Sequence, residues 1–481
     1  MNISVVARYL GIALLLNALF MFISAFVSML YGFDSSFSPL ILSAVITFIA
    51  GGFPLIYVRN RSDINIAEGF SIVVFSWILS CLFGMLPYVL YGGEYSIINS
   101  WFESVSGYTT TGATILTDVE KLPKGLLFWR SSTHWLGGVG VVLFMLLILP
   151  TVSSFRMKLS KMEISDLSKQ NFRYKAQHTI RIITVVYVGL TFLETIFLMI
   201  AGMSLFDAVT HSFATIATGG FSTRNLSVMA FDSKWIEIII MVFMLLSGMH
   251  FGLLYGVASG KSLNLFRSPI IRYYVIATLA CGLLVGLNIK MSGDEEYWGE
   301  AIRHGLFQAI SLSTSTGFAS TDSSAWPSFS ILLLCFLMIQ CASSGSTSGG
   351  IKADRVWIFY KAVKAQIIRQ LHPNAVVQVK IGNHSLDREV VSSVTLYISL
   401  YMLIVFIVAL FLTIMGVDMI DAFTGSIANM GNVGPGFGTV GSLGNYSAFP
   451  VMGKFILSIE MLLGRLEIFP LMLMFVIYKW R

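Results

Sequence analysis

Four short clusters rich in threonine, serine and glycine recur along the chain of 481 residues. Backbone carbonyl and hydroxyl oxygens of such clusters can replace the hydration shell of a monovalent cation, as they do in potassium filters. Glycine suits such a loop because it reaches positive φ without a Cβ clash, which lets successive carbonyls turn toward one axis. The predicted cation-binding residues are Thr110, Thr111, Gly112, Thr218, Gly219, Ser315, Thr316, Gly317, Asn432, Val433 and Gly434.

The spacing of the clusters indicates an internal repeat. Their matched glycines, which are 107, 98 and 117 residues apart, are Gly112, Gly219, Gly317 and Gly434. Close packing of membrane helices also favours small residues, so one cluster alone would be ambiguous. Four clusters in register are better explained as four loops of one pore, although the fourth departs from the threonine-rich pattern with Asn432, Pro435 and Gly436.

Each cluster follows about three turns of weakly apolar helix, which is too short to cross a bilayer. A helix that ends halfway through the membrane leaves backbone groups unpaired unless they line a wet path or are buried in protein. The C-terminal ends of four such helices would also direct partial negative charge toward the axis, which favours cations. The pattern therefore predicts pore helices followed by pore loops.

The elements that position these loops must be membrane helices. The chain is 56% hydrophobic and only 12% charged, and its long apolar stretches predict about ten spanning helices. Each pore loop lies between two such stretches. We therefore expect an all-α membrane protein with four membrane-pore-membrane repeats around a central pore.

Basic residues are concentrated in a few connecting segments, which are 156–181, 261–272, 352–388 and 479–481. Lysine and arginine are enriched in cytoplasmic loops, so these segments should be cytoplasmic. The acidic connection 294–300 then lies outside. This arrangement places both termini in the cytoplasm and predicts an even number of spans.

A serine- and glycine-rich run interrupts the second span of the third repeat. The predicted gating residues in this run are Ala342, Ser343, Ser344, Gly345, Ser346, Thr347, Ser348 and Gly349. A broken membrane helix favours a water-filled path, so we interpret the run as an intramembrane gating loop beneath the filter. The alternative is a kink that only assists packing.

Two charges lie in the otherwise apolar last helix, Arg465 and Glu467. Charge at membrane depth is costly and normally faces a cavity or a partner. Arg465 is predicted to raise a barrier to cations and to bind carbonyls of the gating loop, while Glu467 would neutralise it in one state. A structural ion pair between helices is the alternative. Lys352 is interpreted as part of a cytoplasmic anchor, and His134 as a packing residue or a cavity-facing one.

Several motifs together resemble one family over almost the whole chain. They are Ser104–Thr114, His134–Gly140, Thr218–Ser222, Ser343–Lys352 and Gly431–Gly436. On these segments the chain resembles the Trk/Ktr/HKT superfamily of potassium transporters, and within it the bacterial TrkH-type subunits. Relatives that pass sodium often have serine at the first filter position, so Gly112 favours potassium.

The resemblance implies two extra N-terminal transmembrane helices before the repeats. The expected units are 1–63 for the helix pair and then repeats 64–176, 177–268, 269–372 and 373–481. It also implies a homodimer with one pore in each subunit, a cytoplasmic TrkA-like nucleotide-binding regulatory ring, and a location in the bacterial inner membrane. No covalent cofactor is expected, and K+ is the transported ion. The expected function is potassium uptake through a gated, selective pore.

Other classes of function fit the sequence less well. A Na+- or H+-coupled potassium symporter is the main alternative; it would usually show inverted repeats and a buried carboxylate, for which Glu467 is the best candidate. An enzyme is not expected, because the sequence has neither a phosphate-binding P-loop nor a metal-binding His or Cys motif. A membrane hydrolase would need a base near the serines of the gating loop, and their segment contains none. The basic segments are explained by membrane orientation rather than by nucleic acid.

Overall fold

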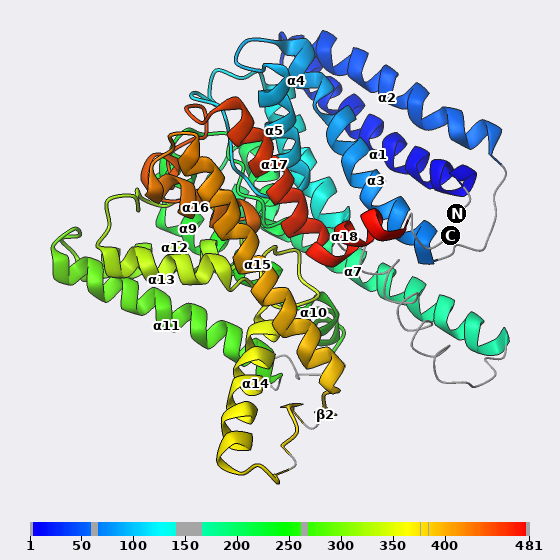
Figure 1. Ribbon diagram of the computed structural model, residues 1–481. Coiled ribbons are helices and arrows are strands. Elements are labelled where there is room, and N and C mark those ends of the chain that lie inside the picture. The colour runs from blue at the N-terminus through cyan, green and yellow to red at the C-terminus, as the bar shows by residue number, and fades with distance from the viewer. Residues whose placement is uncertain are drawn as a thin grey trace.

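The computed structural model describes residues 3–58, 66–140, 166–260, 268–375, 377–382 and 384–477. Within these ranges the chain is mostly helical (Figure 1), and the only strands are β1 (Lys380–Ile381) and β2 (His384–Ser385), which form a small antiparallel hairpin. Of the predicted basic segments 156–181, 261–272 and 479–481, the parts 156–165, 261–267 and 479–481 lie outside the described residues. The predicted all-helical class is therefore confirmed, with the hairpin as a small addition.

Six described helical segments are long and apolar enough to cross a membrane. They are α1 (Ile3–Leu30), α2 (Phe37–Tyr57), the segment Glu68–Tyr91 formed by α3 (Ile66–Gly84) and α4 (Leu86–Tyr91), the Arg181–Ile200 part of α7 (Asp166–Ile200), α11 (Pro269–Ser292) and α15 (Arg388–Ile414). Many large apolar side chains on these helices are exposed, as expected where hydrocarbon is the solvent. The chain is a multi-pass membrane protein.

Four shorter helices precede the four clusters, at the positions predicted for pore helices. They are α5 (Ile97–Tyr108), α8 (Leu205–Ile216), α12 (Trp298–Ser313) and α16 (Met419–Met430). The side chains of Ser96, Ser204 and Asp418 accept hydrogen bonds from the first turns of α5, α8 and α16, which fixes where these helices begin.

The second spans of three repeats are interrupted. In repeat 2, α9 (Lys234–Ser247) and α10 (Phe251–Ala258) meet at 108°. In repeat 3, a loop separates α13 (Ser328–Ile339) from α14 (Ala353–Leu371), and α14 projects away from the other helices (Figure 1). In repeat 4, α17 (Val451–Leu466) gives way to α18 (Ile468–Ile477) at Glu467, whose φ is +61°. The sequence predicted only the interruption in repeat 3.

The largest buried apolar core joins the N-terminal helices to the first pore helix and to α17. Phe102 of α5, Trp129 and Tyr446 are fully buried in it, and the indole nitrogen of Trp129 donates to the carbonyl of Gly84 over 3.2 Å. Figure 1 shows α1 to α3 as a layer on one side of the molecule, and α11 to α14 on the opposite side. The pore helices are thus held between large packed groups.

Candidate cation site formed by four pore loops

The four pore loops share one backbone conformation. In each, a non-glycine residue with φ between +51° and +57° comes first, and a glycine with φ between +78° and +93° follows two positions later. The four triplets are Thr110-Thr111-Gly112, Thr218-Gly219-Gly220, Ser315-Thr316-Gly317 and Asn432-Val433-Gly434. Because non-glycine residues rarely adopt positive φ, its recurrence at equivalent positions indicates one loop structure used four times.

The amide of each middle residue bonds back to its own pore helix. Thr111, Gly219, Thr316 and Val433 each donate to the carbonyl five residues earlier, over 2.8 to 2.9 Å. These bonds satisfy the middle amides and tie each loop to the end of its own helix. The C-terminal ends of the four pore helices, which carry partial negative charge, therefore lie directly behind the loops.

The four loops close into a ring. A Cβ atom added to Gly112 would lie within 3.0 Å of the carbonyl oxygen of Gly219. The same clash recurs from Gly220 to Thr316, from Gly317 to Val433, and from Gly434 back to Thr111. Each glycine thus faces the middle carbonyl of the next repeat, and the fourth repeat completes the circuit with the first.

This ring changes the predicted register of repeat 2. The sequence matched Gly219 to Gly112, Gly317 and Gly434, but positive φ and the contact with the next carbonyl both belong to Gly220. Gly219 is the middle residue instead, at the position of Thr111. The two adjacent glycines made the choice ambiguous in the sequence, and only the ring geometry separates them.

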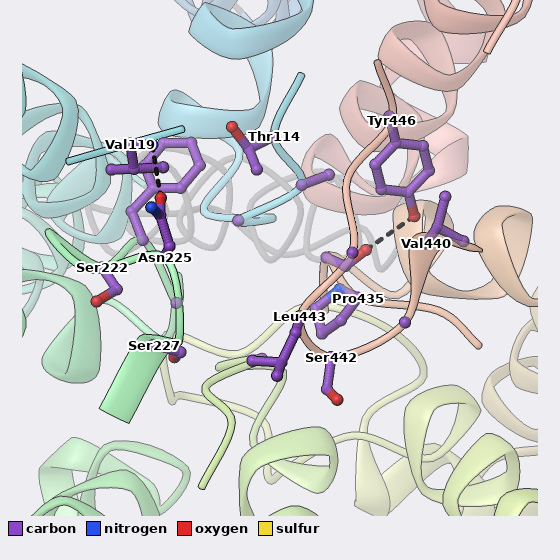
Figure 2. A pocket seen from close by; sticks show the side chains of 18 of the residues that line it. Thr114, Val119, Ser222, Asn225, Ser227, Pro435, Val440, Ser442, Leu443 and Tyr446 are labelled. Carbon is purple, nitrogen blue, oxygen red and sulfur yellow. Dashed lines mark hydrogen bonds between the residues drawn. The ribbon is translucent and has the colours of Figure 1, made fainter. Parts of the chain in front are cut away.

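Hydrogen bonds between neighbouring repeats surround one mouth of the ring, formed by the segments that follow the four triplets. Asn225 of repeat 2 accepts from the amide of Val119 over 2.7 Å and donates to Asp118 over 2.8 Å (Figure 2). The bonds from Asn225 and Lys121 hold the pKa of Asp118 below its usual value. The other junctions are made by Met229 with Ala319, Ser442 with Ser323, and Tyr446 with Thr114.

A small hollow of about 80 Å³ lies at this mouth, lined by the ring glycines and by polar loop residues such as Ser222, Asn225 and Ser442. Figure 2 shows Tyr446 beside it, with its hydroxyl donating over 2.8 Å to the carbonyl of Gly434. The hollow is large enough to hold a water-sized species next to the ring.

A buried ion pair supports the first two loops from behind. Arg130 donates to Glu103 over 2.6 Å, and both side chains are almost completely buried. Glu103 also accepts from the amide of Ile115, while Arg130 donates to the carbonyl of Ser222 in repeat 2. Glu103 is completely buried rather than solvated. Its partner could not be identified because Arg130 lies 27 residues away on another helix.

The predicted gating loop lies directly beneath the ring. Its neck is closed by the backbone pairing of Gln340 with Ile351, so the loop leaves and returns at one point. The amide of Gly349 donates to the Ser315 hydroxyl over 2.8 Å, and the Thr347 hydroxyl donates to the carbonyl of Ile216 over 2.9 Å. The loop therefore contacts the filter residue of repeat 3 and the end of pore helix α8.

Two buried cationic side chains bind consecutive carbonyls of this loop. Arg465 donates to the carbonyl of Thr347 over 2.7 Å, and Lys352 donates to that of Ser348. Both residues are about 5% exposed. Lys352 had been interpreted as a cytoplasmic anchor, and the structure corrects this interpretation, because its ammonium group lies against the loop. The position of Lys352 immediately after the glycine-rich run is the feature of the sequence that could have indicated this contact.

Glu467 does not neutralise Arg465 in this structure. It forms an ion pair with Arg355 of α14 over 2.6 Å. Glu467 lies at the end of α17 with φ of +61° and ψ of 146°, so its backbone leaves the helical conformation there. Several described carboxylates are more deeply buried than Glu467. Among them, Glu460 accepts from the Ser426 hydroxyl over 2.6 Å, and Glu194 of α7 is fully enclosed. The sequence pattern predicts a role for neither.

The fold and this ring define a class of protein, a multi-pass membrane protein whose pore loops from four repeats of one chain meet at a common axis. The family model described as TrkH, cation transport protein, matches residues 38–271 and 295–479. The chain belongs to this TrkH family of cation transport proteins.

Individual relatives are similar over most or all of the chain. The Trk system potassium uptake protein TrkH of Salmonella typhimurium is 36% identical over 428 residues, 88% of each chain. The protein of the same name from Halomonas elongata is 33% identical over the full length of both chains. The crystal structure of the potassium transporter TrkH from Vibrio parahaemolyticus superposes with a TM-score of 0.90 at 31% identity, covering all of both chains.

Proposed function

We propose that this protein takes up potassium across the bacterial inner membrane through a gated, K+-selective pore, with both termini in the cytoplasm. The closed ring of four middle carbonyls carries the proposal, because it offers a dehydrated cation equivalent oxygens from four sides. The eleven predicted filter residues, with Gly220 added, supply the ring and its rim. The names of the relatives, which are potassium uptake proteins, support potassium as the ion.

The gate in this proposal is the loop Ala342–Gly349 together with Arg465. The loop lies beneath the ring, and its hydroxyl groups and amides can be satisfied by other partners if it moves. Arg465 and Lys352 add two positive charges on the same path. A cation leaving the ring toward the cytoplasm would meet both, so the described conformation corresponds to a closed pore.

The test is the reversal potential of the purified full-length protein in planar bilayers, with potassium on one side and sodium on the other. A reversal at the potassium equilibrium value, unchanged when pH is varied on one side, is the expected result. A non-selective current would contradict the proposal.

Coupled transport with Na+ or H+ is the second candidate, and Glu194 and Glu460 favour it because both are fully enclosed carboxylates without a cationic partner among the described residues. In that case the reversal potential would shift in fixed proportion with sodium or pH. Glu460→Gln should then abolish the shift while potassium binding remains. A shift that persists in both Glu194→Gln and Glu460→Gln would exclude these carboxylates as coupling sites.

We also propose a homodimer and regulation by a cytoplasmic TrkA-like nucleotide-binding ring. Helix α14 supports a protein contact, because it presents an exposed apolar stripe of Tyr360, Val363, Ile367 and Leu371. Light scattering of the protein in detergent should give the mass of two chains. A nucleotide-dependent change of flux that requires the added ring would support the regulatory part, and an unchanged flux would contradict it.

A further inference from the structure

One position of the carbonyl ring differs from the other three. The middle residues of repeats 1, 3 and 4 are Thr111, Thr316 and Val433, whereas repeat 2 has Gly219. Gly219 does not have positive φ, so its backbone conformation does not require glycine. Some other feature of the structure must exclude a side chain there.

That feature is the imidazole ring of His134, which lies on the second helix of repeat 1. A Cβ atom added to Gly219 would come within 3.0 Å of three atoms of this ring, Nδ1, Cγ and Cε1. His134 is fully buried. The ring thus occupies the volume that the missing side chain of repeat 2 leaves.

His134 is itself held by the loop that it supports. Its ring stacks on Phe221, two residues after Gly219, with 4.0 Å between centroids and an interplanar angle of 12°. Arg130, one helical turn earlier, lies 3.5 Å from the centroid of the same Phe221 ring. Neither ring nitrogen of His134 has a hydrogen-bond partner among the described residues, so the ring acts through its volume and its stacking.

We propose that His134 is a positioning residue of the filter. From repeat 1, its ring fills the space of the side chain that repeat 2 lacks, and it fixes the Gly219 carbonyl in the ring. A glycine without lateral support has the largest conformational freedom of any residue. Without His134 the Gly219 carbonyl would be free to shift away from Gly112. The ring would then discriminate less well between cations of different size. The inference rests on the proposed selective pore.

The test moves side-chain volume from position 134 to position 219. His134→Ala should lower the K+/Na+ permeability ratio by roughly tenfold, as expected for an emptied, well-packed site. Gly219→Thr should lose potassium flux because its side chain meets His134. The double variant His134→Ala/Gly219→Thr gives repeat 2 the residue found in repeats 1 and 3, and should recover the ratio to within about threefold of the wild type.

The matched control is His304→Ala, since His304 is a buried histidine of pore helix α12 that bonds to Ser320 and contacts no ring glycine. Its permeability ratio should equal that of the wild type. All variants are compared as monodisperse protein in vesicles of one lipid composition. A wild-type ratio retained by His134→Ala, or a double variant no better than the poorer single variant, overturns the inference. A wild-type protein without selectivity would instead overturn the proposed function.

Discussion

The ring and the layer beneath it are built on opposite principles. In the ring, four loops repeat one conformation, and each middle amide bonds back to its own pore helix at nearly the same distance. Beneath it the repeats have diverged: repeat 3 contributes the loop at 340–351, repeat 4 contributes Arg465, and repeat 2 bends by 108° between α9 and α10.

Under the proposed function, this difference separates two tasks in space. Equivalent oxygens around an axis suit recognition of a spherical ion, which needs symmetry but no movement. A gate needs an element with two alternative arrangements, and one loop with replaceable hydrogen bonds can supply it without disturbing the ring. The bend in repeat 2 fits this division, because the amide of Ser343 donates to the carbonyl of Gly248, and that of Phe251 to the carbonyl of Gly345.

The largest effect is expected for Gly112→Ser, which tests the symmetric ring. Its Cβ would clash with the carbonyl of Gly219 at a φ of +82°, so the ring must open. We expect the K+/Na+ permeability ratio to fall by about a hundredfold, as a loss of about 2.8 kcal/mol in discrimination would produce. Reversal potentials measure it.

Gly92→Ser is the matched control for this substitution. Gly92 has a similar φ of +79°, but a Cβ there meets nothing within 4 Å. The control therefore carries the backbone strain without the clash. Equal effects of the two substitutions would show that strain, and not the ring contact, sets the permeability ratio.

Deletion of Ser343–Ser348 tests the layer beneath the ring. The neck pairing of Gln340 with Ile351 remains, while the contact of Thr347 with Ile216 and the bond to Arg465 are lost. Basal potassium flux into vesicles should rise strongly, with an unchanged permeability ratio. A folded protein with unaltered or abolished flux would refute the gate.

Lys352→Met should also raise the basal potassium flux, but by less than the deletion does. A hydrogen bond to a charged group contributes about 1.5–3 kcal/mol, so its loss should raise the open fraction by roughly tenfold. Lys364→Met is the control, since Lys364 is an exposed lysine of α14. Single-channel recording distinguishes open fraction from conductance. If both lysines behave alike, general surface charge is responsible.

The smallest effect is expected at the mouth of the ring that the segments after the triplets form. Asn225→Ala removes bonds that join repeats 1 and 2, which should lower stability by about 1–2 kcal/mol and change selectivity less than twofold. The pKa of Asp118 is lowered in the folded protein. The stability that this carboxylate contributes is therefore present above the usual aspartate pKa and is lost as pH falls through the lowered pKa. Thermal unfolding at pH 7 and pH 5 should therefore give the same difference. Lys121→Ala, which removes a pairing within repeat 1, is the control.

The sequence predicted those features that depend on local pattern. Hydrophobic length and recurring Thr/Gly clusters indicated the spans, the pore helices and the interruption at 342–350. The register of Gly219 and Gly220 could not be chosen, because adjacent glycines satisfy the same pattern. The bend at Gly248, the pairing of Glu467 with Arg355 and the pair Glu103 with Arg130 depend on contacts between distant segments, and hydropathy does not encode them.

The joining of all four repeats in one chain has a consequence for how the filter can change over evolutionary time. In an assembly of four identical subunits, any mutation in the filter appears four times at once. Here Ser315 alone accepts the bond from Gly349, and the other three loops place threonine or asparagine at that position. One quarter of the ring can thus carry a residue suited to contact with the loop, while the other three quarters carry different residues.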